Sequence, residues 1–192
     1  MKKFIKKPVA IILAVVLLVG AVVGGTLAWL TDKTDSVVNT FTTGNINITL
    51  AETTGTTYQM VPGWKITKNP VATVKANSED CYLFVKLDKS DKYGDYMTYE
   101  MAEGWSTLGD SYPGVFYREV AKTTADQPFA VIKDNKITVN ESVTKEMMDA
   151  IEKGTVDNPT LTITAYAIQK DKTNNTPFGA ETAWKTLNGI TT

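Results

Sequence analysis

The 192-residue chain contains no histidine and only one cysteine, Cys81. Without histidine, the Ser-His-Asp and Cys-His catalytic arrangements cannot form. The H-E-x-x-H zinc motif is excluded for the same reason, and an ordinary zinc site would need histidine or several cysteines. An intramolecular disulfide is also impossible. Carboxylate chemistry stays open in principle, but 21 acidic residues are expected on any soluble surface. We therefore predict no catalytic residue, no metal ligand and no cofactor.

The first residues have the three parts of a secretory signal peptide. Four lysines lie within positions 2–7, an apolar run follows from Val9 to Val23, and four of the next five residues, at positions 24–28, are small. Thr26 and Ala28 suit the −3 and −1 positions of a cleavage site. We predict a signal peptide over residues 1–28, cleavage between Ala28 and Trp29, and one domain over residues 29–192.

An uncleaved leader is the alternative. Pro8 to Thr31 holds 24 uncharged residues, whereas about 20 apolar residues span a bilayer. An uncleaved segment would anchor the chain with its lysines in the cytoplasm. The sequence leaves cleavage and anchoring open, and in either case predicts membrane contact only through the leader.

The charge balance of the expected mature chain is acidic. Removing residues 1–28 takes away four lysines and leaves 16 basic and 21 acidic residues, a net charge of −5. A nucleic-acid-binding domain would call for a basic patch. We therefore predict no nucleic-acid partner.

Short strands dominate the rest of the chain. Polar and apolar residues alternate with the period of a half-buried strand, and β-branched and aromatic residues are frequent. The strongest expected strands are 45–50, 71–75, 81–87 and 161–168, and weaker ones are 96–99, 115–120, 129–132 and 136–139.

Turn residues separate these strands, and helix is scarce. Pro-Gly and Asn-Pro pairs mark several turns, and Asp134-Asn135 has the position of a hairpin turn. Apolar spacing predicts one helix over Val143–Lys153, capped by Ser142 or Asn140 and ended by Gly154. A second short helix is expected over Glu181–Leu187. The pattern predicts a mainly β fold, a β-sandwich or jelly roll with one or two short helices.

Four segments resemble those of one protein family. They are Gly24–Asp32 around the expected cleavage site, Asn39–Ile48 with the pattern N-T-F-x-x-G-x-I-x-I, Val61-Pro62-Gly63, and Leu161–Gln169. Together they resemble the TasA/camelysin (CalY) family of Gram-positive bacteria, whose leaders are cut by the specialised signal peptidase SipW.

The resemblance implies a secreted jelly-roll subunit that assembles into biofilm matrix fibres. The implied partners are further copies of the chain, other matrix proteins and a SipW-type peptidase, and the implied location is the extracellular matrix or cell surface. Camelysins have been assigned metalloprotease activity, but this chain lacks histidine to bind the metal, so we do not expect that activity. A monomeric cell-surface adhesin or antigen is the other alternative.

The expected mature N-terminus suggests how copies would join. Large apolar residues lie ahead of the first regular strand, namely Trp29, Leu30, Val37, Val38 and Phe41. A freed segment of this kind can add as a strand to the open sheet edge of another subunit. We predict that Trp29–Phe41 is a donor strand. A frayed terminus, or a strand in the subunit's own sheet, is the competing interpretation.

The positions of cysteine and tryptophan in the sequence predict where their side chains pack. Cys81 alternates with Leu83, Val85 and Leu87, which places it on a core face. A disulfide between subunits is the alternative. Trp64, Trp105 and Trp184 are not spaced along one strand face, so we expect them in core or interface packing rather than on a carbohydrate-binding face.

Overall fold

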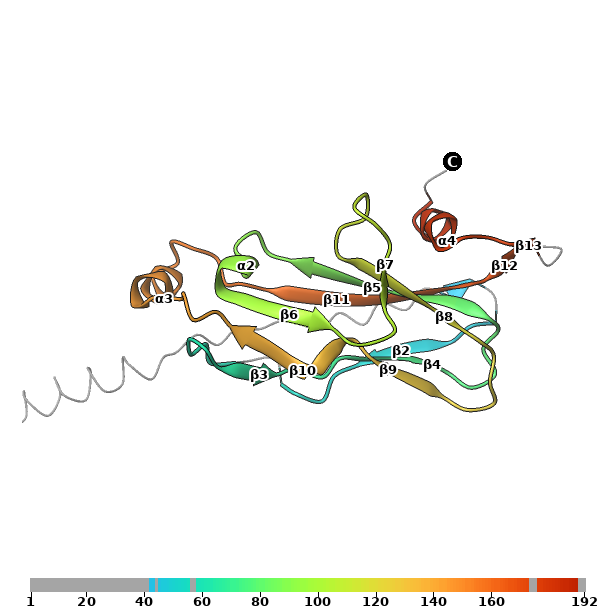
Figure 1. The fold of residues 1–192 in the computed structure, drawn as a ribbon, viewed down its shortest axis with the longest axis horizontal. Coiled ribbons are helices and arrows are strands. Elements are labelled where there is room, and N and C mark those ends of the chain that lie inside the picture. Colours follow the sequence, from blue (N-terminus) through green and yellow to red (C-terminus); the bar gives the residue numbers. More distant parts are fainter. Residues whose placement is uncertain (1–41, 44, 56–57, 173–175, 190–192) are drawn as a thin grey trace, which may run out of the picture.

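The computed structural model describes residues 42–43, 45–55, 58–172 and 176–189, and within them the fold is mainly β (Figure 1). The largest sheet has five strands in the order β1-β11-β5-β8-β7. All its pairs are antiparallel except β1 with β11, which is parallel. Its strands are β1 (Thr42–Thr43), β11 (Leu161–Gln169), β5 (Cys81–Lys89), β8 (Val115–Val120) and β7 (Ser106–Thr107).

Two three-stranded antiparallel sheets and one two-stranded ribbon complete the β-structure. The first sheet contains β2 (Ile48–Ala51), β4 (Val71–Val74) and β9 (Gln127–Ala130), in that order. The second contains β3 (Lys65–Thr67), β10 (Ile132–Val139) and β6 (Met97–Met101). The ribbon pairs β12 (Asp171–Lys172) with β13 (Thr176–Pro177).

The main core lies between the five-stranded sheet and the two three-stranded sheets (Figure 1). Alternate residues of β5 and β11 point into it, because successive side chains of a strand face opposite sides. The buried residues of this core include Ile48, Leu50, Ala72, Val74, Leu83, Val85, Ile132, Ile137, Ile163 and Ala165. The core therefore joins all three sheets.

Three short helices lie among the described residues: α2 (Tyr93–Tyr96), α3 (Lys145–Glu152) and α4 (Ala180–Leu187). The two predicted helices correspond to α3 and α4, whereas α2 was not expected. The expected cap of α3 was wrong, because the Met147 backbone N–H donates to Oγ1 of Thr144 at 3.3 Å. Gly154 follows the helix at φ +68°, a conformation that favours glycine, as its predicted role at the helix end requires.

Each expected strand overlaps a strand of the structure, but the expected hairpin turn at Asp134-Asn135 is wrong. Both residues lie inside β10, with φ of 53° and 54°. Pairing of β10 with β6 shifts register between Ile132 and Ile137, so the two residues form a bulge in one strand. Asn and Asp tolerate left-handed backbone in turns and bulges alike, which is why the sequence pointed to a turn.

A buried ion pair joins the two three-stranded sheets. Lys68 follows β3, and its Nζ lies 2.9 Å and 3.1 Å from the two carboxylate oxygens of Glu52, which follows β2. The side chains are 7% and 10% exposed. The Tyr58 hydroxyl donates to Glu52 Oε1 at 3.2 Å, and the ammonium lies 5.7 Å from the Tyr58 ring centroid. Removing either charge would leave the other buried without its partner.

Replacing Lys68 should therefore destabilise the domain strongly. We expect Lys68→Met to lower the free energy of unfolding by about 3–5 kcal/mol, the usual effect of breaking a buried ion pair. Urea unfolding of residues 29–192 measures this change. The matched control is Lys75→Met, because the Lys75–Asp126 pair has side chains 43% and 49% exposed. The control should lose less than about 1 kcal/mol, and equal losses in the two variants would contradict the account.

Candidate functional site

The two edges of β11 differ in how many of their residues pair with a neighbouring strand. On one edge all nine residues pair with β5, from Leu161 opposite Lys89 to Gln169 opposite Cys81. On the other edge, β1 pairs only with Ala167 and Ile168. Within the described part of the chain, no strand pairs with residues 161–165 on this edge. Unpaired N–H and C=O groups along a strand are a ready template for another strand.

Apolar surface lies on both faces of β11 beside this open edge. Leu161, Ile163 and Ala165 are at most 6% exposed and belong to the main core. Tyr166 and Ile168 point to the opposite face, where they pack with α4. An added strand would therefore contact apolar side chains on both faces of the sheet.

Helix α4 covers the second face of the sheet through Trp184, which is 5% exposed. The Trp184 ring centroid lies 5.2 Å from that of Phe84 and 5.2 Å from that of Tyr166, the latter in an edge-on arrangement. Aromatic pairs of this geometry add to the free energy of burial. The helix and its tryptophan thus form an aromatic platform over β5 and β11.

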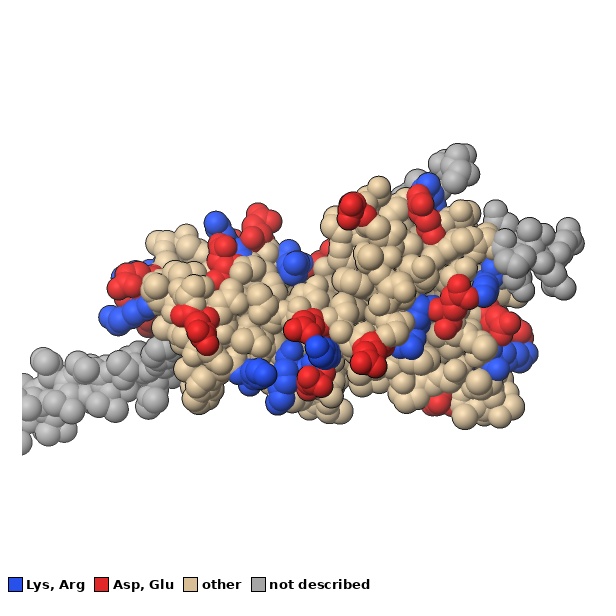
Figure 2. Space-filling model, viewed as in Figure 1, with Lys and Arg blue, Asp and Glu red and all other residues tan. Residues whose placement is uncertain are grey.

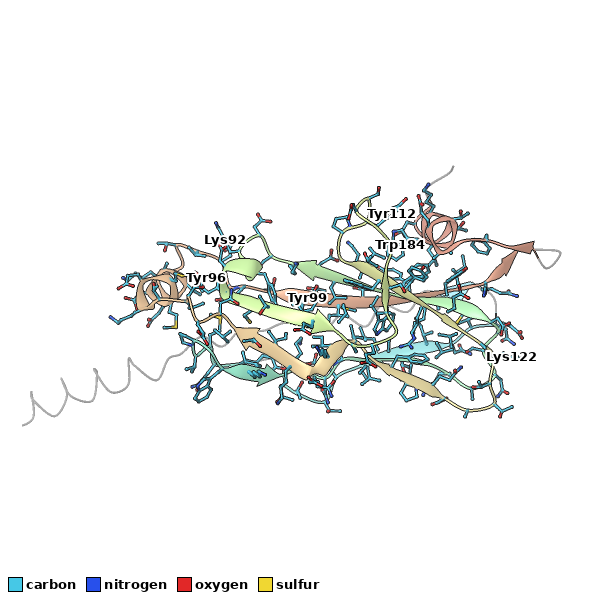
Figure 3. All side chains as sticks on the ribbon, in the orientation of Figure 1. Lys92, Tyr96, Tyr99, Tyr112, Lys122 and Trp184 are labelled. Atoms are coloured by element: carbon cyan, nitrogen blue, oxygen red, sulfur yellow. The ribbon has the colours of Figure 1, made fainter. Side chains whose placement is uncertain are left out.

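A loop before β8 holds α4 in place. The Tyr112 hydroxyl donates to Glu181 Oε1 at 3.3 Å, and Tyr112 lies close to Trp184 of α4 (Figure 3). Lys185 also pairs with Glu181 at 3.0 Å. The hydrogen bond and charge of Lys185 hold the pKa of the Glu181 carboxyl below its usual value. The carboxylate is therefore available at neutral pH to accept both contacts.

The predicted donor and cleavage residues lie outside the described part of the chain. These residues are Ala28, Trp29, Leu30, Val37, Val38 and Phe41. The structure therefore describes the open strand edge but not the segment expected to fill it. Sequence reasoning did not find the Trp184 platform, although Ala180, Ala183, Trp184 and Leu187 have the i, i+3, i+4, i+7 spacing of an apolar helix face.

The three tryptophans singled out in the sequence have different environments. Trp184 is buried, as expected for core packing. Trp105 packs against the main core, and its Nε1 donates to the Ala130 carbonyl at 2.8 Å. Trp64, in contrast, is 62% exposed, so it does not pack in the core, and interface packing, the other part of the expectation, stays a prediction for this residue.

No protein-family description, no curated protein and no solved structure matches the chain. Among the residues described, none of the helices has the length and apolar character needed to cross a bilayer. In the same residues, no three Cys, Asp or Glu side chains come together as a metal site would require.

The position of Cys81 agrees with the predicted core face, because the residue is 0% exposed. Burial, with a smaller contribution from the Asp80 charge, raises the pKa of its thiol to about 12. The thiolate is the reactive form of cysteine. In the folded protein this form is therefore scarce at neutral pH.

Cys81 should consequently be inert toward thiol reagents until the protein unfolds. At pH 8 we expect Ellman's reagent to label the native chain at least about 100-fold more slowly than the urea-unfolded chain. The unfolded-state thiol has the lower pKa, so its reaction accelerates as pH approaches 9 while that of the native chain stays slow. Equal labelling rates, or a Cys81-linked dimer on a non-reducing gel, would contradict the burial of this thiol.

Proposed function

We propose that the protein is an exported structural subunit of extracellular fibres, whose copies join by strand addition at the open edge of β11. One observation supports the proposal: among the described strands, none pairs with residues 161–165 on this edge of β11, and apolar surface lies on both faces beside it. The resemblance of the cleavage region and of Asn39–Ile48 to TasA/camelysin proteins supports it. The same resemblance supports a SipW-type signal peptide over residues 1–28 and a jelly-roll domain.

The register of β1 indicates how a donor strand would fit. Thr42 lies opposite Ala167 in parallel orientation. If the donor strand of another copy took the place of this chain's β1 in the same register, position 37 would lie opposite Thr162, position 38 opposite Ile163 and position 41 opposite Tyr166. Val38 would then face the main core, and Phe41 would face the Trp184 platform. Val38 and Phe41 would thus pack against the apolar surfaces on the two faces of β11, one residue on each face.

Strand addition between copies would produce a filament rather than a closed pair. The donor segment and the acceptor edge are different parts of the chain, so the contact is head-to-tail, and such contacts propagate when the rotation does not close. Backbone hydrogen bonds along positions 161–165 would supply affinity, while side chains at alternate positions would supply specificity.

Truncation tests whether the N-terminal segment drives assembly. Deleting residues 29–38 from the mature chain should leave a folded monomer that forms no fibres, because the donor is lost while the core residues remain. Electron microscopy and sedimentation measure assembly, and circular dichroism checks folding. Normal fibres from the truncated chain would refute strand donation.

Engineered cysteines test the register and the chain origin of the donor. In a Cys81→Ala background, Val37→Cys combined with Thr162→Cys should form disulfide-linked ladders of many chains. Neighbouring paired strands bring Cα atoms within the 4.4–6.8 Å range that a disulfide needs. The matched control combines Val37→Cys with Thr107→Cys, because Thr107 lies on β7 at the far edge of the same sheet, and it should form no ladder.

The pattern of cross-links separates the competing interpretations. A disulfide within one chain would place residues 29–41 in the subunit's own sheet and would favour the monomeric surface adhesin. The absence of any cross-link would overturn the proposed register.

A further inference from the structure

The outer face of the β3-β10-β6 sheet carries a cavity that strand addition does not use. Its volume is about 340 Å³, within the range of small-molecule sites in proteins. Lysine and acidic side chains gather over β10 on this face (Figure 2). The acceptor edge of β11 belongs to a different sheet, so any function of this cavity is separate from assembly.

The bulge of β10 helps to shape the cavity. Lys65 on β3 and Thr98 on β6 both lie opposite Thr138 on β10, so these three residues form a row across the sheet. Beyond this row, β10 shifts register, and Asp134 and Asn135 adopt φ of 53° and 54°. Lys133, Asp134 and Lys136 line the cavity at this bulge.

More lysines than acidic residues line the cavity. Lys65, Lys133 and Lys136 line it together with Glu100 and Asp134, which gives a local charge of +1 in a chain of formal charge −1. Lys133 pairs with Glu100 at 2.5 Å. The hydrogen bond and charge of Lys133 lower the pKa of Glu100, and those of Glu100 raise the pKa of Lys133. This pair is therefore fully charged at neutral pH and neutralises itself.

Two lysines are left to bind an incoming anion. Lys136 Nζ donates to the hydroxyl of Thr67 rather than to a carboxylate. Lys65 forms no ion pair or side-chain hydrogen bond with any described residue. A carboxylate between Lys65 and Lys136 would gain charge-assisted hydrogen bonds, which are about twice as strong as neutral ones.

The remaining polar groups favour a sugar. Glu100 and Asp134 can accept hydrogen bonds from sugar hydroxyls, and Thr98 and Thr138 can both donate and accept. Nucleic acid and polyphosphate would instead place negative charge beside these two acids, which costs free energy. The mixture of two available lysines, acids and hydroxyls matches a ligand that has both a carboxylate and several hydroxyl groups.

We propose that this cavity binds uronic acid units of an acidic polysaccharide. The carboxylate lies between Lys65 and Lys136, and the ring hydroxyls contact Glu100, Asp134 and the threonines. The site lies on a sheet face away from the β11 edge, so a fibre of such subunits would carry one polysaccharide site per copy. The proposal does not depend on strand donation.

Calorimetric titration of residues 29–192 with oligogalacturonate tests the site. We expect binding that weakens as salt is added, and a loss of at least about 10-fold in affinity for the Lys65→Gln/Lys136→Gln variant. The matched control is Lys75→Gln/Lys122→Gln, which removes two exposed lysines that belong to other surface ion pairs. This control should bind as the unmodified chain does, and unchanged urea unfolding midpoints show that the variants are folded.

Binding measurements with other ligands test whether the site requires both a carboxylate and sugar hydroxyls. Fully methyl-esterified oligogalacturonide, which keeps the hydroxyls but lacks the charge, should not bind. Glu100→Gln should strengthen any binding of polyphosphate, because it removes a negative charge beside the ligand. The proposal is overturned if oligogalacturonate does not bind, if the Lys65/Lys136 variant binds it unchanged, or if polyphosphate or single-stranded DNA binds the unmodified chain equally well. The truncation lacking residues 29–38 should retain binding, so failure of assembly and failure of this site are distinguishable.

Discussion

The nine-residue antiparallel pairing of β5 with β11 is the interaction on which the rest of the structure depends. It places Leu83 and Val85 with Ile163 and Ala165 on the main-core face. On the opposite face it creates the aromatic surface that α4 covers with Trp184. Because one edge of β11 is fully occupied by β5, any further strand must add on the other edge. The same pairing thus determines the core, the aromatic platform and the position of the candidate assembly site.

Sequence reasoning found the elements with strong periodicity and missed those whose form depends on distant contacts. Alternation in 81–87 and 161–168 identified β5 and β11 because both strands are long. The four-residue helix α2 is too short for a 3.6-residue period to be visible. Asp134-Asn135 was interpreted as a hairpin turn, since left-handed backbone serves turns and bulges equally. Only the pairing of β10 with two neighbouring strands distinguishes these cases.

One part of the candidate assembly site was predicted from the sequence, and the other part was found only in the structure. Its expected donor, Trp29–Phe41, came from apolar residues at a predicted cleavage site and from the TasA/camelysin resemblance. Its acceptor could not have been predicted from the sequence, because the open edge of β11 depends on the order β1-β11-β5-β8-β7. That order brings together segments far apart in the chain. The Trp184 platform was missed for a related reason: an apolar helix face does not indicate which surface it covers.

The proposed assembly edge and the lysine-lined cavity lie on different sheets, so the two proposed functions would not compete for the same surface. The edge depends on backbone pairing and apolar burial rather than on exposed charges. The cavity depends on exposed charges, which salt screens.

The most direct measurement is N-terminal sequencing of the protein recovered from extracellular material, combined with electron microscopy of the same sample. The account predicts a mature N-terminus at Trp29 on protein that forms filaments, since only a freed segment can enter another subunit's sheet. An intact Met1 on membrane-bound protein without filaments would contradict it and would favour an anchored surface protein.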